Sequence, residues 1–511
     1  MTKVKRVSLL CLALVLLCSC LFSACSNVNS PTSAPPSDSS SAPPTATSSP
    51  AGPPVHIKWY IGGNYPCPDQ DKVFQAVNDY LITKLNAQID FVPIAWGDYD
   101  QKMSVVIASK QQFDLCYTAN WVNNFVANVS KGAFLPLDDL LQTDAPQTYA
   151  SMPASFWNAV RIDGKIYGVI NQQVFSQVPA IIYPTANATK YNFDPSTYVK
   201  GDISTLDPFI SQMFADNPNG YVIFDMGAAG ITGQDYPAGW NIPGAIDVND
   251  SSLTVFNQWT SPAMLKEYAT LQDWNTKGWT QSTKRMTETD DPVTDWASGL
   301  VLMKIGGTYK PGGDISDGAA YSVDLSEIPS NNAILTTGGI QATLTAVSAT
   351  SANPDMAMKV VELMNTDPTL YNLIANGIEG THYTLNSDGL MVPTDQQANY
   401  NPGNAWAVGT NFLSYVSAGM PKDVWDQTKQ FNDSATVSPL LGFTFDPTPV
   451  KDDIAKCTAI MAQYARGLGL GYYTTDQYND MVSQLQAAGS DNIIAEMQKQ
   501  IDAWKTTQTG N

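Results

Sequence analysis

The side chains best suited to chemistry in this sequence are aromatic rings and amides. The chain has 12 Trp and 23 Tyr but only two histidines, His56 and His382, and no HExxH pair of the kind that binds zinc. It also has no Gly-x-Ser-x-Gly turn and no phosphate-binding glycine loop. Rings and amides together suit sugar-binding grooves, because the C–H face of a sugar packs on a ring while its hydroxyls bond to amides and carboxylates. Most of the rings are nevertheless expected in the core, and neither a metal nor a cofactor is predicted.

The charge of the chain excludes one large class of partner. It carries 27 Lys and Arg against 47 Asp and Glu, a net charge of −20. A protein that binds nucleic acid needs a basic face, so no nucleic-acid partner is predicted. Charged residues make up only 14% of the chain, where about 25% is usual.

The elements that must position these side chains alternate between strand and helix. Val55 to Ile61 is rich in β-formers, and a helical pattern follows from Asp71. A second strand at 89–94, a second helix at 99–108 and a third strand at 113–118 continue the series. This alternation predicts a parallel sheet with right-handed crossovers.

Ligands of such sheets bind beyond the carboxyl ends of the strands, which points to the three loops that follow them. From these loops we predict ligand contacts by seven residues: Asn64, Tyr65, Trp96, Asp98, Tyr99, Asn120 and Trp121. The alternatives are that Trp121 is a core ring at the start of a helix, and that Gly62 and Gly63 serve only a tight turn.

The rest of the chain contributes further strands and a helical C-terminus. Asp163-Gly164 is typical of a hairpin turn within 161–169. Thr474-x-x-Gln477 has the form of a capping box, and Ser490 is expected to start a last helix with Ile494, Met497, Ile501 and Trp504 on its apolar stripe. Other strands are expected at 179–183, 300–305 and 342–347, and other helices at 264–278 and 452–468.

The first 54 residues predict an exported and anchored protein. Residues 1–24 combine a basic start, an apolar run and small residues before Cys25, as in a secretory signal. Leu21-Phe22-Ser23-Ala24-Cys25 resembles a bacterial lipobox, with Cys20 as the alternative lipidated residue. Residues 25–54 are rich in Ser and Pro and are predicted to be a disordered tether that holds the domain away from the membrane.

Three cysteines follow the signal segment: Cys67, Cys116 and Cys457. Their number is odd and their spacing does not match a metal site. Cys116 lies in an apolar run and is predicted to be a small buried hydrophobe, and a disulfide from Cys67 to either of the others stays open.

Several motifs resemble the extracellular solute-binding proteins of ABC importers, the large family that includes maltose-binding protein. The N-terminal α/β series and the Asp-Gly-Lys-Ile-Tyr-Gly hairpin carry this resemblance over most of the chain. A closer similarity is to the LipO-like lipoprotein branch, whose C-terminal region is catalogued as a domain of unknown function. Its motifs here include Trp96 to Tyr99, Thr118 to Trp121, Gly306 to Gly313, Gly377 to Tyr383 and Ser438 to Asp446.

The resemblance implies an α/β, bilobal, periplasmic-binding-protein-like fold of type II with hinge crossovers and an added helical C-terminal region. One lobe would hold 55–176 and 298–345, and the other 177–297 and 346–511. The ligand would be a sugar or oligosaccharide held in the cleft, with an ABC permease as partner. The protein would be a monomer, lipid-anchored on the outer face of the cytoplasmic membrane. Further ligand contacts are then expected from Tyr309, Lys310, Glu379, His382, Tyr383 and Trp240.

Two other functions compete with this interpretation. A peptide-binding or adhesin-type surface lipoprotein would share the signal segment and the tether. An extracellular carbohydrate-active enzyme would need a pair of carboxylates as acid and base, and no spacing among the 47 acidic residues singles one out.

Overall fold

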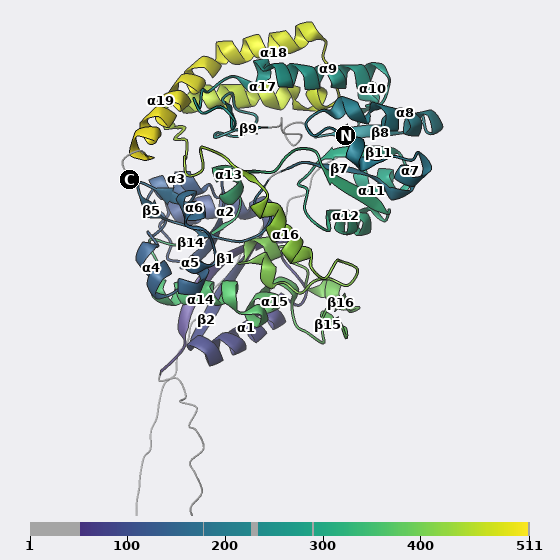
Figure 1. The fold of residues 1–511 in the computed structure, drawn as a ribbon. Helices are drawn as coiled ribbons and strands as arrows, with labels where there is room; N and C mark the ends of the chain where they lie inside the picture. The colour runs from purple at the N-terminus through teal and green to yellow at the C-terminus, as the bar shows by residue number, and fades with distance from the viewer. Residues whose placement is uncertain (1–51, 177, 226–232, 289–290, 509–511) are drawn as a thin grey trace, which may run out of the picture. The chain divides into compact units, whose positions relative to one another are not determined.

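The computed structural model describes residues 52–508 apart from 177, 226–232 and 289–290 (Figure 1). The predicted signal at 1–24, both candidate lipidation sites (Cys20 and Cys25) and all of the predicted tether except 52–54 lie outside the described residues. Among the residues that are described, no helix is long and apolar enough to cross a membrane.

The first sheet has five strands in the order β2-β1-β3-β14-β6. β1 is parallel to both β2 and β3, while β14 runs antiparallel to β3 and to β6. The predicted strands near the N-terminus are confirmed, and the predicted strand at 342–347 joins them. The strands are β1 (Val55–Gly63), β2 (Ala87–Ala95), β3 (Leu115–Thr118), β6 (Val169–Ile170) and β14 (Leu344–Val347).

Helices cover this sheet on both faces. α1 (Gln70–Leu85) connects β1 to β2, and α2 (Trp96–Ala108) connects β2 back across β1 to β3. Because the two right-handed crossovers run in opposite directions along the sheet, their helices lie on opposite faces. α14 (Pro354–Thr366) and α15 (Pro368–Asn376) come from much later in the chain; α15 packs against α1, and α14 packs against α15 and α5 (Figure 1).

Short elements complete this part of the molecule. β4 (Arg161–Ile162) and β5 (Lys165–Ile166) form the predicted hairpin, with Asp163 and Gly164 both at positive φ. The others are α3 (Phe125–Ser130), α4 (Asp138–Thr143), α5 (Pro146–Ala150), α6 (Ala154–Asn158), α13 (Thr337–Ile340), β15 (Tyr383–Leu385), β16 (Met391–Pro393), η4 (Gln397–Asn399), η5 (Ala405–Ala407) and η6 (Asn411–Leu413).

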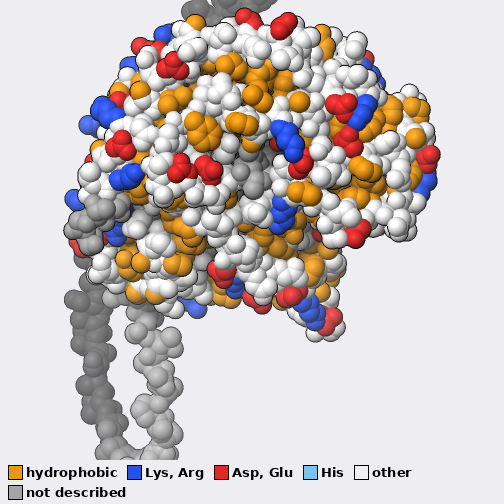
Figure 2. Space-filling model, turned by 45° about the horizontal axis from the view of Figure 1, so that its top comes forward, with side chains coloured by type: hydrophobic (Ala, Val, Ile, Leu, Met, Phe, Trp, Pro, Cys, Tyr) orange, Lys and Arg blue, Asp and Glu red, His pale blue; other side chains and the backbone are white. Residues whose placement is uncertain are grey.

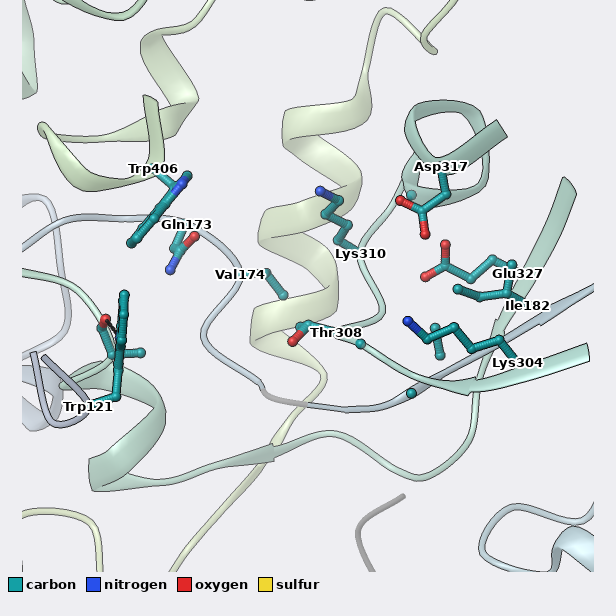
Figure 3. Close-up of a pocket in the computed structure, with 15 residues that line it drawn as sticks. Trp121, Gln173, Val174, Ile182, Lys304, Thr308, Lys310, Asp317, Glu327 and Trp406 are labelled. Atoms are coloured by element: carbon teal, nitrogen blue, oxygen red, sulfur yellow. Dashed lines mark hydrogen bonds between the residues drawn. The ribbon is translucent and has the colours of Figure 1, made fainter. Parts of the chain in front are cut away.

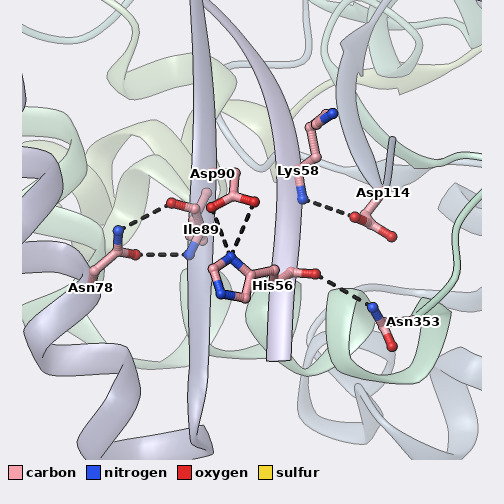
Figure 4. A network of polar contacts seen from close by, with 7 residues as sticks. All are labelled: His56, Lys58, Asn78, Ile89, Asp90, Asp114 and Asn353. Carbon is pink, nitrogen blue, oxygen red and sulfur yellow. Dashed lines mark hydrogen bonds and ion pairs between the residues drawn. The ribbon is translucent and has the colours of Figure 1, made fainter. Parts of the chain in front are cut away.

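Polar contacts hold the strands in register at the end of the sheet away from the strand-end loops (Figure 4). Asn78 of α1 bonds to both backbone groups of Ile89, at 2.7 and 3.1 Å. The Lys58 N–H donates to Asp114 Oδ2 at 2.8 Å, which joins β1 to the start of β3. His56 Nδ1 lies 3.0 Å from Asp90 Oδ1, so this histidine links β1 to β2.

The second sheet has four strands in the order β12-β7-β11-β8. β11 is parallel to β8 and antiparallel to β7. The strands are β7 (Ala180–Pro184), β8 (Tyr221–Phe224), β11 (Val301–Gly306) and β12 (Leu325–Pro329). The elements around them are α7 (Thr185–Lys190), η1 (Pro195–Thr197), η2 (Ile203–Leu206), α8 (Asp207–Asp216), β9 (Gln234–Asp235), β10 (Ile246–Asp247), η3 (Gln258–Thr260), α9 (Pro262–Thr276), α10 (Ser282–Arg285), α11 (Pro292–Ala297) and α12 (Gly313–Tyr321).

The predicted division into lobes is wrong at two places. It assigned 298–345 to the first lobe, but β11 and β12 hydrogen-bond to β7 in the second sheet. It assigned everything after 345 to the second lobe, but α14 and α15 bury their apolar faces in the core of the first sheet. The chain therefore returns to the first lobe with β14 and stays there through about residue 413.

The C-terminal helices pack on the second lobe, as predicted. They are α17 (Lys451–Gly469), α18 (Thr475–Ala488) and α19 (Ser490–Gln508). α18 begins with the predicted capping box, in which Thr474 Oγ1 accepts from Gln477 N and the Gln477 side chain accepts from Thr474 N. Cys457, Met461 and Leu485 join the core that contains Trp259 and Leu271.

Three segments of chain cross between the two sheets. The first runs from β6 to β7, the second from β12 to β14, and the third leaves α15 through α16 (Val424–Asp433) toward the C-terminal helices. The second and third pair with each other as β13 (Ile334–Leu335) and β17 (Thr436–Val437), and η7 (Thr448–Val450) then leads into α17. We call the three crossing segments together the hinge region.

The face of the molecule drawn in Figure 2 carries charged side chains of both signs. On the face drawn in Figure 2, Lys and Arg side chains are mixed with Asp and Glu side chains instead of gathering into one basic field.

The three cysteines that follow the signal segment can also be compared with the sequence prediction. Cys67, Cys116 and Cys457 are free and buried, so Cys116 is the small core residue that was predicted.

We predict that Tyr99→Phe destabilises the first lobe by about 1–3 kcal/mol. The Tyr99 hydroxyl is completely buried, lies 3.0 Å from Tyr60 O and 3.1 Å from Tyr117 O, and accepts from Tyr117 N at 2.9 Å. The substitution leaves the buried N–H of Tyr117 without its acceptor. Chemical denaturation measures the loss. Tyr472→Phe at an exposed position is the control, and equal midpoints for the two variants would contradict this account.

Candidate functional site

The carboxyl ends of β1, β2 and β3 bring the predicted loops together. Trp96 follows β2 directly, and its ring lies over Gly62 at the end of β1. A Cβ at position 62 would overlap the six-membered part of that ring. Gly62 was predicted either to let a ligand approach the backbone or to form a tight turn. In the structure it leaves the space that the ring of Trp96 occupies.

Four rings form an aromatic cluster at this edge of the sheet, and we call it the aromatic platform: Trp96, Tyr117, Trp121 and Trp406. Trp96 stacks on Trp406 with ring centroids 5.2 Å apart and an angle of 18° between the planes. Trp121 lies 6.2 Å from both Trp96 and Trp406. The edge of Tyr117 meets Trp96 and Trp406 at 5.3 and 5.7 Å, so it supports the platform from the core side.

Trp121 is exposed although its position is fixed. Its Nε1–H donates to Ala342 O at 2.8 Å, and the side-chain amide of Asn120 donates to Gly338 O at 3.0 Å. Both acceptors lie in the segment that precedes β14, which pairs with β3. Trp121 is nevertheless 58% exposed. A large ring held at its edge and open at its faces is a surface for a flat apolar ligand group.

A first cavity of about 400 Å³ lies between the two lobes (Figure 3). Figure 3 shows Trp121 and Trp406 on one side of it and Lys304, Asp317 and Glu327 on the other. Its walls consist of first-lobe rings, residues of the first crossing segment and residues of the second sheet: Trp121, Gln173, Val174, Ala180, Ile182, Lys304, Gly306, Gly307, Thr308, Lys310, Gly313, Asp317, Glu327, Ala342 and Trp406.

Charged groups of both signs line the second-lobe side of the first cavity. Lys304 Nζ is 3.4 Å from Asp225 Oδ2. Burial, and then the carboxylate of Asp317, raise the pKa of Glu327 to about 8, although the backbone N–H of Lys310 favours its ionised form. At neutral pH Glu327 therefore holds a proton and can both donate and accept hydrogen bonds.

A second cavity, of about 790 Å³, also uses Trp121 as part of its wall. Residues of four regions line it: the end of β3 with α3, the segment 235–242 of the second lobe, the segment 337–341 before β14, and the segment 440–448 with the first turn of α17. They are Asn120, Trp121, Asn124, Val126, Ala127, Ser130, Lys131, Asp235, Tyr236, Pro237, Ala238, Gly239, Asn241, Ile242, Thr337, Gly338, Gln341, Leu440, Phe443, Thr444, Phe445, Asp446, Pro447, Thr448 and Ile454.

Some predicted site residues reach these cavities. Asn120 and Trp121 line the second cavity, Trp121 and Lys310 line the first, and Trp96 supports the platform from behind. Asp98 is exposed in the first turn of α2, where a carboxylate stabilises the helix start. Tyr99 is a core residue that joins β1 to β3.

Other predicted residues pack away from the two cavities. Asn64 is exposed beside the 402–403 loop, to which its N–H donates at Pro402 O (2.7 Å). Tyr65 is buried against Phe74, and burial raises the pKa of its hydroxyl. Tyr309 packs on Phe431 at 5.1 Å, and Trp240 packs on Trp259 at 6.0 Å.

Glu379, His382 and Tyr383 were expected in the second lobe, and that placement is wrong. They follow α15, which belongs to the first lobe, and His382 is completely buried there. Its Nδ1 accepts from Ile378 N at 2.9 Å, and its Nε2 lies 3.2 Å from Asp69 Oδ2. Both ring nitrogens are thus used within the fold. Glu379 is exposed, and Tyr383 is buried near Tyr415.

Sequence patterns missed Trp406, Gln173, Lys304 and Glu327. Trp406 lies in η5, a single turn without periodicity, and Gln173 lies in a crossing segment without secondary structure. Lys304 and Glu327 are polar residues within strands, where alternation favours a solvent-facing side chain. Only the pairing of β11 and β12 with β7 places both at one cavity.

Comparison with known proteins supports one family. A family model described as DUF3502, a domain of unknown function, matches residues 439–506. A carbohydrate ABC transporter substrate-binding protein of Streptococcus pneumoniae is 25% identical over 455 residues, which cover 87% of this chain and 90% of the relative. By this similarity the chain resembles the substrate-binding proteins of carbohydrate ABC transporters.

Solved structures confirm the bilobal fold of this chain. The N-glycan transport solute binding protein NgtS of Streptococcus pneumoniae matches with a TM-score of 0.79 at 23% identity, over 89% of this chain and 100% of that one. Its complexes with Man1GlcNAc and Man5GlcNAc match over 88% and 89% of this chain, with TM-scores of 0.69 and 0.68 at 22% and 23% identity and 99% of each of those chains covered. Within the described residues, no cluster of three or more His, Cys, Asp or Glu could hold a metal ion.

We predict that Glu327→Gln flattens the dependence of stability on pH. In the wild type, the raised pKa means that Glu327 contributes stability that is complete below its ordinary pKa near 4.5 and is lost as pH rises to about 8. Between about pH 5 and about pH 8.5 the wild type should lose roughly 2–4 kcal/mol more than the variant. Urea unfolding across this range measures the difference.

The control for this prediction is Glu379→Gln, which changes an exposed glutamate in the other lobe. It should keep the wild-type pH profile. Parallel profiles for the wild type and Glu327→Gln would show that Glu327 is ionised across the range, which contradicts the proposed proton.

Proposed function

We propose that this protein is a solute-binding protein that captures a neutral oligosaccharide between its lobes and delivers it to an ABC importer. The observation that carries the proposal is the placement of two partly open indole rings, Trp121 and Trp406, across the first cavity from hydrogen-bonding side chains (Figure 3). A sugar has one apolar C–H face and a rim of hydroxyls. It therefore matches a cavity that is aromatic on one side and polar on the other.

The polar side of the first cavity supplies the groups that hydroxyls need. Gln173 and Thr308 offer an amide and a hydroxyl, and Asp317 offers acceptors. Glu327 with its proton adds a group that donates as well as accepts. With Glu327 protonated, Lys304 is paired with Asp225, and the lining holds one further cation, Lys310, and one carboxylate, Asp317, which favours a neutral ligand over a polyanion.

The two halves of the first cavity come from different lobes, and this supports a closing mechanism. The platform belongs to the first lobe, while Lys304, Asp317 and Glu327 belong to the second. A ligand that contacts both halves binds more tightly when the lobes approach, so it shifts the population toward a closed form. The permease would then recognise that closed form.

The comparison with NgtS supports the same two states. The TM-score falls from 0.79 to 0.69 and 0.68 for the complexes of that protein, although the shares of both chains covered stay nearly the same. We infer from this difference that the lobes of NgtS are arranged differently in its glycan complexes. We infer that the lobes here are arranged as in an open form.

The cellular setting follows from the N-terminal residues. We propose that Cys25, or Cys20 in its place, carries the lipid and that residues 25–54 tether the binding domain outside the cytoplasmic membrane. The permease in that membrane would be the partner, and the protein would act as a monomer.

We predict that Trp121→Ala and Trp406→Ala each weaken oligosaccharide binding by about tenfold or more, since each removes a stacking surface. Thermal-shift screening with Man5GlcNAc, maltohexaose and short peptides identifies the ligand class, and calorimetry then gives the affinities. A ligand at a hundredfold excess over its Kd should add about 2.7 kcal/mol to the stability.

Trp425→Ala is the matched control, because its Nε1–H also bonds to a backbone carbonyl (Ser414 O, 2.8 Å) but it lines neither cavity. It should keep the wild-type affinity. Shifts with peptides alone would overturn the sugar assignment, and full affinity in both platform variants would remove the platform from the site.

A further inference from the structure

We propose that the second cavity is a further arm of the ligand site, and that the segment 440–448 of the domain of unknown function forms the wall that holds the distal units of the oligosaccharide. This inference rests on the proposed function and extends it. It makes the ligand a glycan long enough, or branched enough, to lie on both sides of Trp121, and it gives the C-terminal domain a part in recognition.

The two cavities meet at one residue. Trp121 lines both, and its indole is fixed by the bond to Ala342 O. Their volumes, about 400 and about 790 Å³, both fall within the range of roughly 300–1,000 Å³ that is usual for ligand sites. A chain of sugars stacked at Trp121 can therefore extend from the first cavity into the second.

The wall from the C-terminal domain is held firmly in place. Phe443 and Phe445 are 5% and 6% exposed and pack with Met497 and Ile501 of α19. The backbone of Asp446 is clamped by one side chain of the same helix. Its N–H donates to Gln500 Oε1 at 2.9 Å, and its carbonyl accepts from Gln500 Nε2 at 2.9 Å. The last helix thus positions a loop that faces the cavity.

The lining of the second cavity has the composition of a sugar site. Asn241 and Thr444 add polar groups among the apolar walls, and Phe443 and Phe445 add ring edges. The charged groups are Lys131, Asp446 and the buried Asp235, whose carboxylate accepts from Ser438 Oγ at 2.6 Å. No excess of positive charge among these lining residues attracts an anion, so we assign the arm to neutral sugar units.

The second cavity also joins parts of both lobes. Ala127 and Lys131 come from the first lobe, while 235–242 and 440–448 belong to the second. Sugar units in this arm would add contacts across the lobes. Longer glycans would then favour the closed form more strongly than short ones, because the shift depends on differential contacts.

Ala127→Trp tests the arm by filling the second cavity without removing a contact. Ala127 is exposed on α3 and lines this cavity alone, so the larger side chain has a small cost to folding. The probes are two pairs that differ in length, Man1GlcNAc with Man5GlcNAc and maltose with maltohexaose. Calorimetry measures each with the wild type, with Ala127→Trp, and with Ala263→Trp as a control on an exposed face of α9.

In whichever pair binds, we expect Ala127→Trp to weaken the affinity for the longer glycan by at least about tenfold. The affinity for the shorter glycan should change by less than about twofold. Ala263→Trp should match the wild type for both. Equal affinity of the variant and the wild type for the longer glycan would overturn the arm. Equal weakening of both lengths would also overturn it, because the second cavity would then hold the primary site.

Hydrogen exchange on the unmodified protein gives an independent readout. The longer glycan should slow exchange in the peptide that covers 440–448, and the shorter glycan should leave it unchanged. Unchanged exchange with a bound longer glycan contradicts the role of the C-terminal wall while the proposed function stands. Failure of all four probes to bind the wild type would instead contradict the proposed function and this inference with it.

Discussion

The side chain of Asn432 joins the segments on which any movement of the two lobes depends. Its Oδ1 accepts from Phe175 N at 2.8 Å, and its Nδ2 donates to Gln173 O at 2.7 Å. The first and third crossing segments are therefore bonded together, and β13 with β17 bonds the third to the second. Gln173 and Val174 also line the first cavity. The crossing segments and the first cavity thus share a piece of chain, so a ligand in this cavity would contact the proposed hinge directly.

The chemistry of the site is divided between the lobes. The first lobe contributes rings because three strand ends converge there, and Gly62 leaves the space that Trp96 needs behind the platform. The second lobe contributes charged and protonated groups from strands whose neighbours bury them, which is why Glu327 keeps a proton at neutral pH. In the first cavity, the rings come from one lobe and the charged side chains from the other. Under the proposed function, this division would make affinity depend on closure.

Sequence patterns were sufficient for the parts of this fold that are local. Periodicity located α1, α2 and the strands around them, and the strand-end rule selected Asn120 and Trp121, which line the second cavity. Sequence patterns were insufficient where pairing between segments far apart in the chain determines the position of an element. The apolar run of β11 fits either sheet, and only its hydrogen bonds to β7 and β8 assign it to the second lobe. Trp406 reaches the platform from a loop more than 280 residues beyond Trp121, and no local pattern indicates that meeting.

The C-terminal domain illustrates how a peripheral element can enter a site. Its helices bury their apolar faces against α9 and the 240–259 region, far along the chain from the platform. Such packing alone would make the domain a brace for the second lobe. The loop before α17 has a second set of neighbours, however, because it lies across a cavity from Asn120, Gly338 and Gln341 of the first lobe. A brace requires only the first set. The second set matters if the second cavity holds ligand, as proposed, and the bonds from Gln500 that hold Asp446 in place would then supply the rigidity that recognition needs.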